Sequence, residues 1–124
     1  MNPGNLAGMR AVVRTEYGDV DVLQVQEVPA PVPGPDEVLV EVMASAMNRA
    51  DLLQRAGQYP APGPQPEYEV PGLEFSGTIA AVGSQVVSWS PGDAVMGIVS
   101  GGAMAEMLVT HERMLQPVPS SVGL

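Results

Sequence analysis

The sequence predicts a mainly β domain, a barrel or sandwich of short strands with one or two short helices. About seven runs rich in Val, Ile and other strand-forming residues follow one another at regular spacing. The 13 prolines and 14 glycines stand mostly between these runs, where they favour turns. A length of 124 residues is enough for one domain with its own hydrophobic core.

The first segment, residues 1–8, is rich in Asn and Gly, and we expect it to be a flexible leader. The domain itself is expected to span residues 9–124. Two strands are predicted over 9–17 and 20–28. In the second strand, valines and a leucine occupy both sets of alternating positions, so we expect both of its faces to be partly covered.

The clearest strand is predicted over residues 37–47. Val38, Val40 and Val42 share one face, while Glu37 and Glu41 lie on the other, the pattern of a half-buried strand. Ser90 to Asp93 has Pro and Gly at the two central positions of a type II turn. Four further strands are expected over 72–83, 93–99, 103–110 and 114–119.

The one helix-length segment is "MNRADLLQRAGQY", residues 47–59. Asn48 can cap a helix by accepting from its first N–H groups, and Asp51 complements the positive end of the helix dipole. Asp51 and Arg55 are four residues apart and are expected to form a surface pair, worth about 0.3–0.5 kcal/mol. Leu52, Leu53 and Ala56 supply an apolar side. A capped helix therefore explains the polar residues of this segment without a catalytic role.

The composition excludes several classes of function. The chain has five arginines, no lysine, 14 carboxylates and a net charge of −9, which disfavours nucleic acid as a partner. The absence of cysteine excludes disulfides, thiolate zinc sites and a cysteine nucleophile. No apolar run reaches the roughly 18 residues of a membrane helix, so we expect a soluble, cytoplasmic protein without a membrane partner.

Other side chains of interest have simple structural interpretations. Glycine-rich phosphate loops and the G-x-S-x-G motif are absent. The single histidine, His111, is expected to be a solvated loop residue without a role. The eight methionines are expected to fill the core as adaptable side chains, in preference to lining a ligand surface.

Two longer stretches carry a family resemblance. "ASAMNRADLLQRAGQYPAP" followed by "VPGLEFSGTIAAVGSQVVSWSPGDAVMG" resembles the N-terminal, GroES-like domain of zinc-independent quinone oxidoreductases, the zeta-crystallin-like class of the medium-chain dehydrogenase/reductase superfamily. The resemblance covers nearly all of residues 9–124. It implies a GroES-like, partly open β-barrel and the reduction of quinones or related enones by NADPH.

The resemblance also implies that no zinc is used. Zinc-dependent members place a ligand cysteine where this chain has Asn48 and a ligand histidine where it has Leu73. This chain does have the carboxylates Asp51 and Glu74. Carboxylates alone do not make such a site, because zinc favours thiolate or imidazole ligands. We expect Glu74 to be a partly buried, hydrogen-bonded strut.

The family match makes three residues candidates for contact with the cofactor, and two of them are expected to have positioning roles. Tyr59 is the best candidate for contact with the nicotinamide end of NADPH, with Asn48 as a polar residue nearby and Arg49 as a weaker candidate for binding the cofactor. Tyr59 and Asn48 are expected to orient the ring or a carbonyl oxygen and not to act as strong acid or base. The proline-rich loop 60–71 is expected to form a wall of the substrate cleft, in which Tyr68 faces the quinone or packs on the barrel.

The chain differs from the family at its end. After "QPVPSSVGL", relatives continue into the Rossmann domain that binds most of the cofactor, and their dimers assemble largely through that domain. The expectation is a fragment without activity, derived from a homodimeric enzyme. Two alternatives stay open: an autonomous GroES-like binding module, and an enoyl-thioester reductase domain of the same superfamily.

Overall fold

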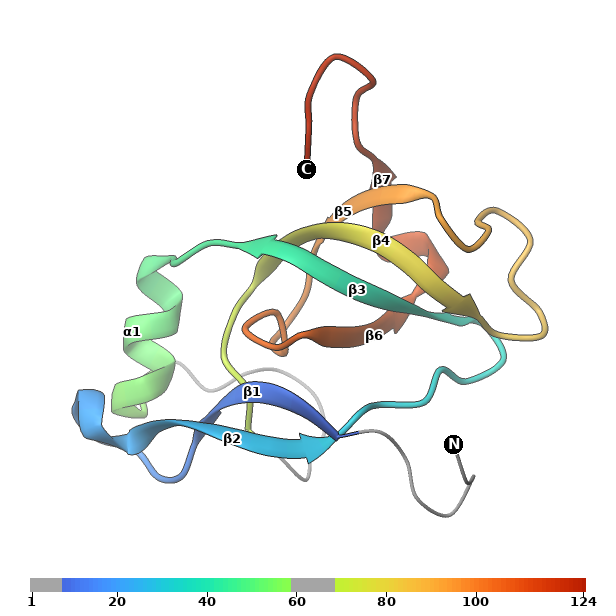
Figure 1. Ribbon diagram of the computed structural model, residues 1–124. Coiled ribbons are helices and arrows are strands. Elements are labelled where there is room, and N and C mark those ends of the chain that lie inside the picture. The colour runs from blue at the N-terminus through green and yellow to red at the C-terminus, as the bar shows by residue number, and fades with distance from the viewer. Residues whose placement is uncertain (1–7, 59–68) are drawn as a thin grey trace.

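Over the residues that the structure describes, the fold consists of two antiparallel β-sheets and one α-helix (Figure 1). The computed structural model describes residues 8–58 and 69–124. Its elements, in chain order, are β1 (Gly8–Arg14), the 3-10 turn η1 (Val20–Val22), β2 (Leu23–Pro29), β3 (Glu37–Ser45), α1 (Arg49–Ala56), β4 (Glu74–Val82), β5 (Ala94–Ile98), β6 (Met107–His111), the 3-10 turn η2 (Glu112–Met114) and β7 (Leu115–Pro117).

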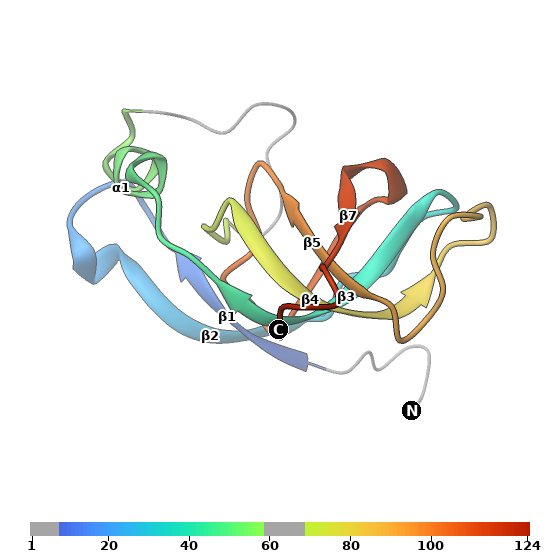
Figure 2. The same cartoon turned by 90° about the horizontal axis from the view of Figure 1, so that it is seen from above.

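The two sheets differ in size and face each other without closing into a barrel. β1 and β2 form a hairpin, and the larger sheet has the strand order β6-β3-β4-β5-β7. Figure 1 shows the hairpin across from the larger sheet, with α1 at one end of both, and Figure 2 shows how strongly the larger sheet curls. The expected mainly β, partly open, GroES-like barrel is confirmed.

Most of the predicted elements are present. All seven strands form, although the bounds differ by a few residues, and residue 8, which we placed in the leader, is the first residue of β1. The turn from Ser90 to Asp93 is also confirmed: the Asp93 N–H donates to the Ser90 carbonyl oxygen at 3.1 Å, and Gly92 has the positive φ of 94° that a type II turn needs. The expectation of a leader over residues 1–7 lies outside the described residues.

Two expectations about the second strand are wrong. Residues 20–22 form the 3-10 turn η1, because the Asp19 side chain caps this turn by accepting from the Val20 N–H. The strand then begins at Leu23, and only one of its faces is covered. Val28 is buried, whereas 72% of Val25 is exposed.

The main core lies inside the curled sheet. β3 behaves as its alternating pattern predicts, with Val38 and Val40 fully buried and Val42 packed at the margin. A second, smaller cluster lies on the hairpin and comprises Ala11, Val13 and Val28. The buried residues of the main cluster are Val38, Val40, Phe75, Ile79, Val95, Ala103, Leu108 and Leu115.

The expectation that methionines fill the core is wrong. None of the seven methionines in the described ranges is fully buried, and only Met9 packs against a core cluster. The interior is filled mainly by short, branched side chains, which suit closely spaced strands. The longer methionine side chains therefore lie at the margins of the fold.

The hairpin is attached to the rest of the domain through the strand β1. Ala11 forms a bridge with Ala105, and the Val12 N–H donates to the Met104 carbonyl oxygen at 2.9 Å. Glu106 binds β1 twice through hydrogen bonds: its N–H donates to the Arg10 carbonyl oxygen at 3.0 Å, and its side chain accepts from the Arg10 N–H at 2.5 Å. Because the Glu106 carbonyl oxygen also accepts from the Val42 N–H, this residue connects the hairpin to β3.

The attachment should depend on pH through Glu106. Hydrogen bonds from the Arg10 N–H and guanidinium, and the Arg10 charge, hold the pKa of this exposed carboxyl below its usual range. A lowered pKa in the folded state means that the stabilisation is complete above the pKa of the unfolded chain, about 4, and is lost as the pH falls through the folded pKa.

We therefore expect the urea-derived stability difference between the wild type and Glu106→Gln to be larger near neutral pH, about 7, than at about pH 3. Because the pair is exposed, concentrated salt should reduce its ionic part. A difference that does not change with pH would contradict this role of Glu106.

Candidate functional site

The candidate site begins at the N-terminus of α1. Asn48 takes the extended backbone conformation of a cap, and its N–H donates to the Asp51 carboxylate at 2.7 Å. The Asn48 side-chain oxygen faces the first turn, as in a capping box, without completing a hydrogen bond. Asn48 therefore occupies the predicted cap position, but its side chain does not complete the hydrogen bond that we expected, and Asp51 is the side-chain acceptor instead.

Asp51 is not the surface residue that we expected. Only 4% of it is exposed, and its second oxygen accepts from the Gly72 N–H at 3.1 Å, a contact between residues 21 positions apart. Among the described residues it forms no ion pair with Arg55, whose Nε instead donates to the Gly18 carbonyl oxygen at 3.2 Å. Asp51 can be buried because two directed backbone N–H groups stabilise its carboxylate.

The apolar side of α1 is also less buried than expected. Leu52 is 44% exposed, Ala56 is exposed and Leu53 is only partly covered, and Asp51 is the one residue of α1 that is fully buried. The hydrogen bonds that Asp51 accepts and Arg55 donates, more than hydrophobic packing, therefore connect α1 to the neighbouring segments.

The segment that receives α1 depends on Gly72. Its φ is 108°, and a Cβ at this position would lie 2.7 Å from the Met104 nitrogen, so only glycine fits without strain. Backbone bonds hold this segment against residues 99–104, including those from Met104 to Pro71 at 3.0 Å and from Val99 to Leu73 at 2.8 Å. Leu73 is fixed in this backbone network because its carbonyl oxygen accepts from the Val99 N–H.

Asn48 and Glu74 meet across this junction. The Asn48 Nδ2 donates to the Glu74 Oε2 at 3.2 Å, and both side chains are part-buried. The expectation that Glu74 is a partly buried, hydrogen-bonded strut is confirmed. Glu74 pairs in register with Ile98 of β5, so the two side chains lie on the same face of the sheet, where 69% of Ile98 is exposed.

The other predicted site residues are not part of this junction. Arg49 is the exposed first residue of α1. Tyr59 and Tyr68 lie outside the described residues, as does most of the loop 60–71 that we expected to line the cleft. The roles assigned to Tyr59 and Tyr68 therefore stay predictions.

His111 lies at the end of β6, not in a loop. Its Nε2 is 3.2 Å from the Asp36 Oδ2, and its Nδ1 accepts from the Arg113 N–H at 3.1 Å. These partners belong to the turn η2 and to the segment before β3, and neither is part of α1 or of the segment before β4. In the part of the chain that the structure describes, no three His, Asp or Glu side chains are grouped as metal ligands.

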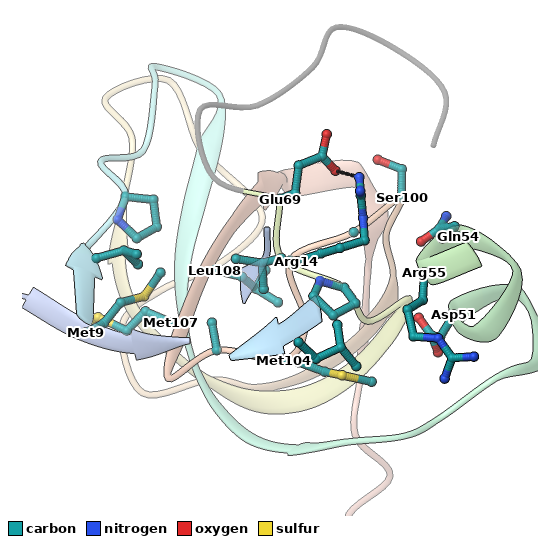
Figure 3. A pocket seen from close by; sticks show the side chains of 18 of the residues that line it. Met9, Arg14, Asp51, Gln54, Arg55, Glu69, Ser100, Met104, Met107 and Leu108 are labelled. Carbon is teal, nitrogen blue, oxygen red and sulfur yellow. Dashed lines mark ion pairs between the residues drawn. The ribbon is translucent and has the colours of Figure 1, made fainter. Parts of the chain in front are cut away.

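A cavity of about 630 Å³ lies between the hairpin, α1 and β6, and its lining includes residues 69–71, the described end of the loop 60–71 that we expected to form a wall of a cleft (Figure 3). Met47, Asp51 and Leu52 form its wall on the side of α1. Arg14, the last residue of β1, also lines it. The Arg14 guanidinium pairs with Glu69 at 2.9 Å and stacks on the Tyr17 ring at 4.1 Å.

No helix within residues 8–58 and 69–124 is long and apolar enough to cross a membrane.

The buried position of Asp51 leads to a stability prediction. Asp51→Ala removes both acceptors and leaves the buried Gly72 N–H without its partner, which should lower the free energy of unfolding by about 1–3 kcal/mol. Glu16→Ala, a change of an exposed carboxylate, is the matched control. Urea denaturation followed by circular dichroism checks it, and equal losses in the two variants would show that Asp51 is not a structural link.

The sequence matches the family model described as "Alcohol dehydrogenase GroES-like domain" over residues 34–120. Among curated proteins, quinone oxidoreductase-like protein 2 of Mus musculus is 43% identical over 82% of this chain and 29% of its own length. The chloroplastic NADPH-dependent alkenal/one oxidoreductase of Arabidopsis thaliana is 33% identical over 92% of this chain and 32% of its own.

A solved structure agrees with these matches. The quinone oxidoreductase of Pseudomonas syringae superposes with a TM-score of 0.85 and 30% identity, over 93% of this chain and 35% of that one. This chain thus spans about a third of the length of each of the three proteins. From the family model and these relatives together, the chain belongs to the alcohol dehydrogenase GroES-like domain family, in the medium-chain dehydrogenase/reductase superfamily.

Proposed function

We propose that this domain is the N-terminal, substrate-side part of an oxidoreductase that uses NADPH to reduce quinones or related enones. Relatives named for quinone and alkenal reduction support the proposal, and one of them is named as NADPH-dependent. Because this chain spans about a third of their length, most of the cofactor would be bound by a separate Rossmann domain. The 124 residues alone are then expected to be inactive.

The observation that carries the proposal is the fixed position of the Asn48 amide. Asn48 is held by its own N–H on Asp51 and by its side chain on Glu74, so its side chain has little freedom to rotate. An amide both donates and accepts hydrogen bonds, and the bond to Glu74 uses one of its two side-chain N–H groups. Such a group suits the orientation of a carboxamide or a carbonyl oxygen.

The residues around Asn48 fit the nicotinamide end of the cofactor. When bound, NADPH supplies the hydride. Asn48, and Tyr59 by family resemblance, would orient the nicotinamide ring or the substrate carbonyl, while the exposed guanidinium of Arg49 is suited to a phosphate group. The exposed Ile98 side chain beside Glu74 adds an apolar surface that suits a flat, uncharged ring.

We propose that the reaction needs no zinc. At the two positions where zinc-dependent members of the superfamily carry ligands, this chain has the Asn48 amide and the Leu73 hydrocarbon side chain. Neither is a good zinc ligand. Asp51 also has both of its oxygens engaged by backbone N–H groups.

The broader expectations about the complete protein belong to the same proposal. We expect a cytoplasmic homodimer whose partners are small quinone-like molecules and not nucleic acid or membrane. For this domain, the net charge of −9 on its 124 residues supports the exclusion of nucleic acid, because it repels a phosphate backbone.

The proposal is tested by removing each positioning group in the complete polypeptide. Asn48→Ala and Tyr59→Phe should each lower kcat/KM for quinone reduction by about tenfold or more, because each removes a group that orients the reacting atoms. The measurement is NADPH oxidation with 1,4-naphthoquinone, corrected for the folded fraction.

Asn48→Ser distinguishes positioning from capping. Both variants lose the bond to Glu74, but serine is a good helix cap, so Asn48→Ser should be thermally more stable than Asn48→Ala and still lose activity to a similar degree. Undiminished kcat/KM in both Asn48→Ala and Tyr59→Phe would contradict the proposed roles. An activity that follows stability across the Asn48 variants would show that Asn48 is only a cap.

A further inference from the structure

The turn η2 joins the two edges of the larger sheet. β6 is the strand at one edge and β7 the strand at the other, and the three residues of η2 connect them. The loop between β4 and β5 is bound to the same turn through Glu112. The Glu112 carbonyl oxygen accepts from the Trp89 Nε1 at 2.9 Å, and one of its carboxylate oxygens accepts from the Val87 and Ser88 N–H groups at 3.4 Å each. The conformation of η2 therefore affects both sheet edges and this loop.

His111 caps the turn with a ring nitrogen that has to be unprotonated. His111 is the N-cap residue of η2, and its Nδ1 accepts from the Arg113 N–H at 3.1 Å. A neutral imidazole has one donor and one acceptor, so the hydrogen must then lie on Nε2, which donates to the Asp36 Oδ2 at 3.2 Å. Neutral His111 thus satisfies both partners at once.

Protonation of His111 strengthens one of these contacts and removes the other. With a hydrogen on both nitrogens, the ring is attracted to the Asp36 carboxylate, but Nδ1 can no longer accept from the Arg113 N–H. The side chains of His111 and Asp36 are 42% and 53% exposed, and an exposed ion pair contributes little. The loss of the cap is therefore the larger structural consequence.

The charged groups around His111 belong to the segments that meet at this turn. Asp36 precedes β3, and Glu37 lies opposite His111 in the register of β3 and β6. Glu112 and Arg113 are part of η2 itself, and the part of the β4–β5 loop that is bound to η2 carries no charged side chain. The Glu37 and Glu112 carboxylates already accept from backbone N–H groups. Asp36 is therefore the carboxylate that faces a protonated His111.

We propose that η2 is a pH-sensitive switch, closed when His111 is neutral and open when His111 is protonated. In the open form the Arg113 N–H has no acceptor, the turn loosens, and the Trp89 indole loses its bond to Glu112. Histidine is the side chain whose ordinary titration falls between about pH 5 and 8, and His111 is the single histidine of the chain.

The switch goes beyond the reductase proposal and does not rest on it. None of its residues belongs to the junction of Asn48 and Glu74. The two proposals can therefore fail separately.

The test follows two N–H signals of the nitrogen-15-labelled, 124-residue chain by NMR between about pH 8 and 5. The Trp89 indole N–H is a unique reporter, because the chain has one tryptophan. The Arg113 amide reports the cap directly. As the pH falls, both signals should move toward the positions of N–H groups without a protein acceptor, along the same titration curve as the His111 ring.

Two substitutions separate the cap from the charge. His111→Asn keeps a capping side chain and cannot titrate, so both signals should stay in their closed positions throughout. His111→Lys has the positive charge but no acceptor, so both signals should have their open positions even at about pH 8.

The proposal is overturned if the Trp89 and Arg113 signals do not change while the His111 ring titrates. The same transition in His111→Asn would also contradict it, because another group would then be responsible. Closed positions in His111→Lys would show that the cap does not hold the turn. The wild-type titration is decisive by itself, even if a variant does not fold.

Discussion

The arrangement of the candidate site depends on the buried carboxylate of Asp51. One oxygen accepts from the Asn48 N–H and the other from the Gly72 N–H, so a single side chain connects the start of α1 to the segment before β4. α1 has little buried apolar surface of its own. Together with the Asn48–Glu74 and Arg55–Gly18 hydrogen bonds, this carboxylate fixes the start of α1 and with it the Asn48 amide.

Features that depend on near neighbours could be predicted from the sequence. The alternation in β3 was visible because the side chains of a strand repeat every two residues, and the turn at Ser90 to Asp93 was visible because Pro and Gly determine its backbone angles. The cap at Asn48 was also predictable from its position before a helix-length run. Glu74 could be placed as a strut because a carboxylate between two apolar residues of a strand needs a partner.

Features that depend on distant contacts could not be predicted in this way. The bond from Asp51 to Gly72 joins residues 21 positions apart, and the local sequence gives an equally good reason for a pair with Arg55. The methionines were assigned to the core because they are apolar, but their place at the margins follows from how the hairpin meets the larger sheet. The role of Tyr59 rests on family resemblance alone, and that of Tyr68 on its place in the proline-rich loop 60–71.

The site and the cavity use the same segment around α1 in different ways. On one side, Asn48 and Glu74 form a polar pair beside the exposed Ile98. On the other, Met47 and Leu52 face the cavity that reaches to Met9 and Met107.

The most direct test of the proposed zinc-independent reductase is NADPH oxidation with a quinone in the presence of a chelator. It is measured for the polypeptide of natural length and for residues 1–124 alone. The account predicts quinone-dependent oxidation by the natural polypeptide and none by the 124 residues. A natural polypeptide that ends at Leu124, or one that oxidises NADPH with neither quinone nor enone, would contradict it.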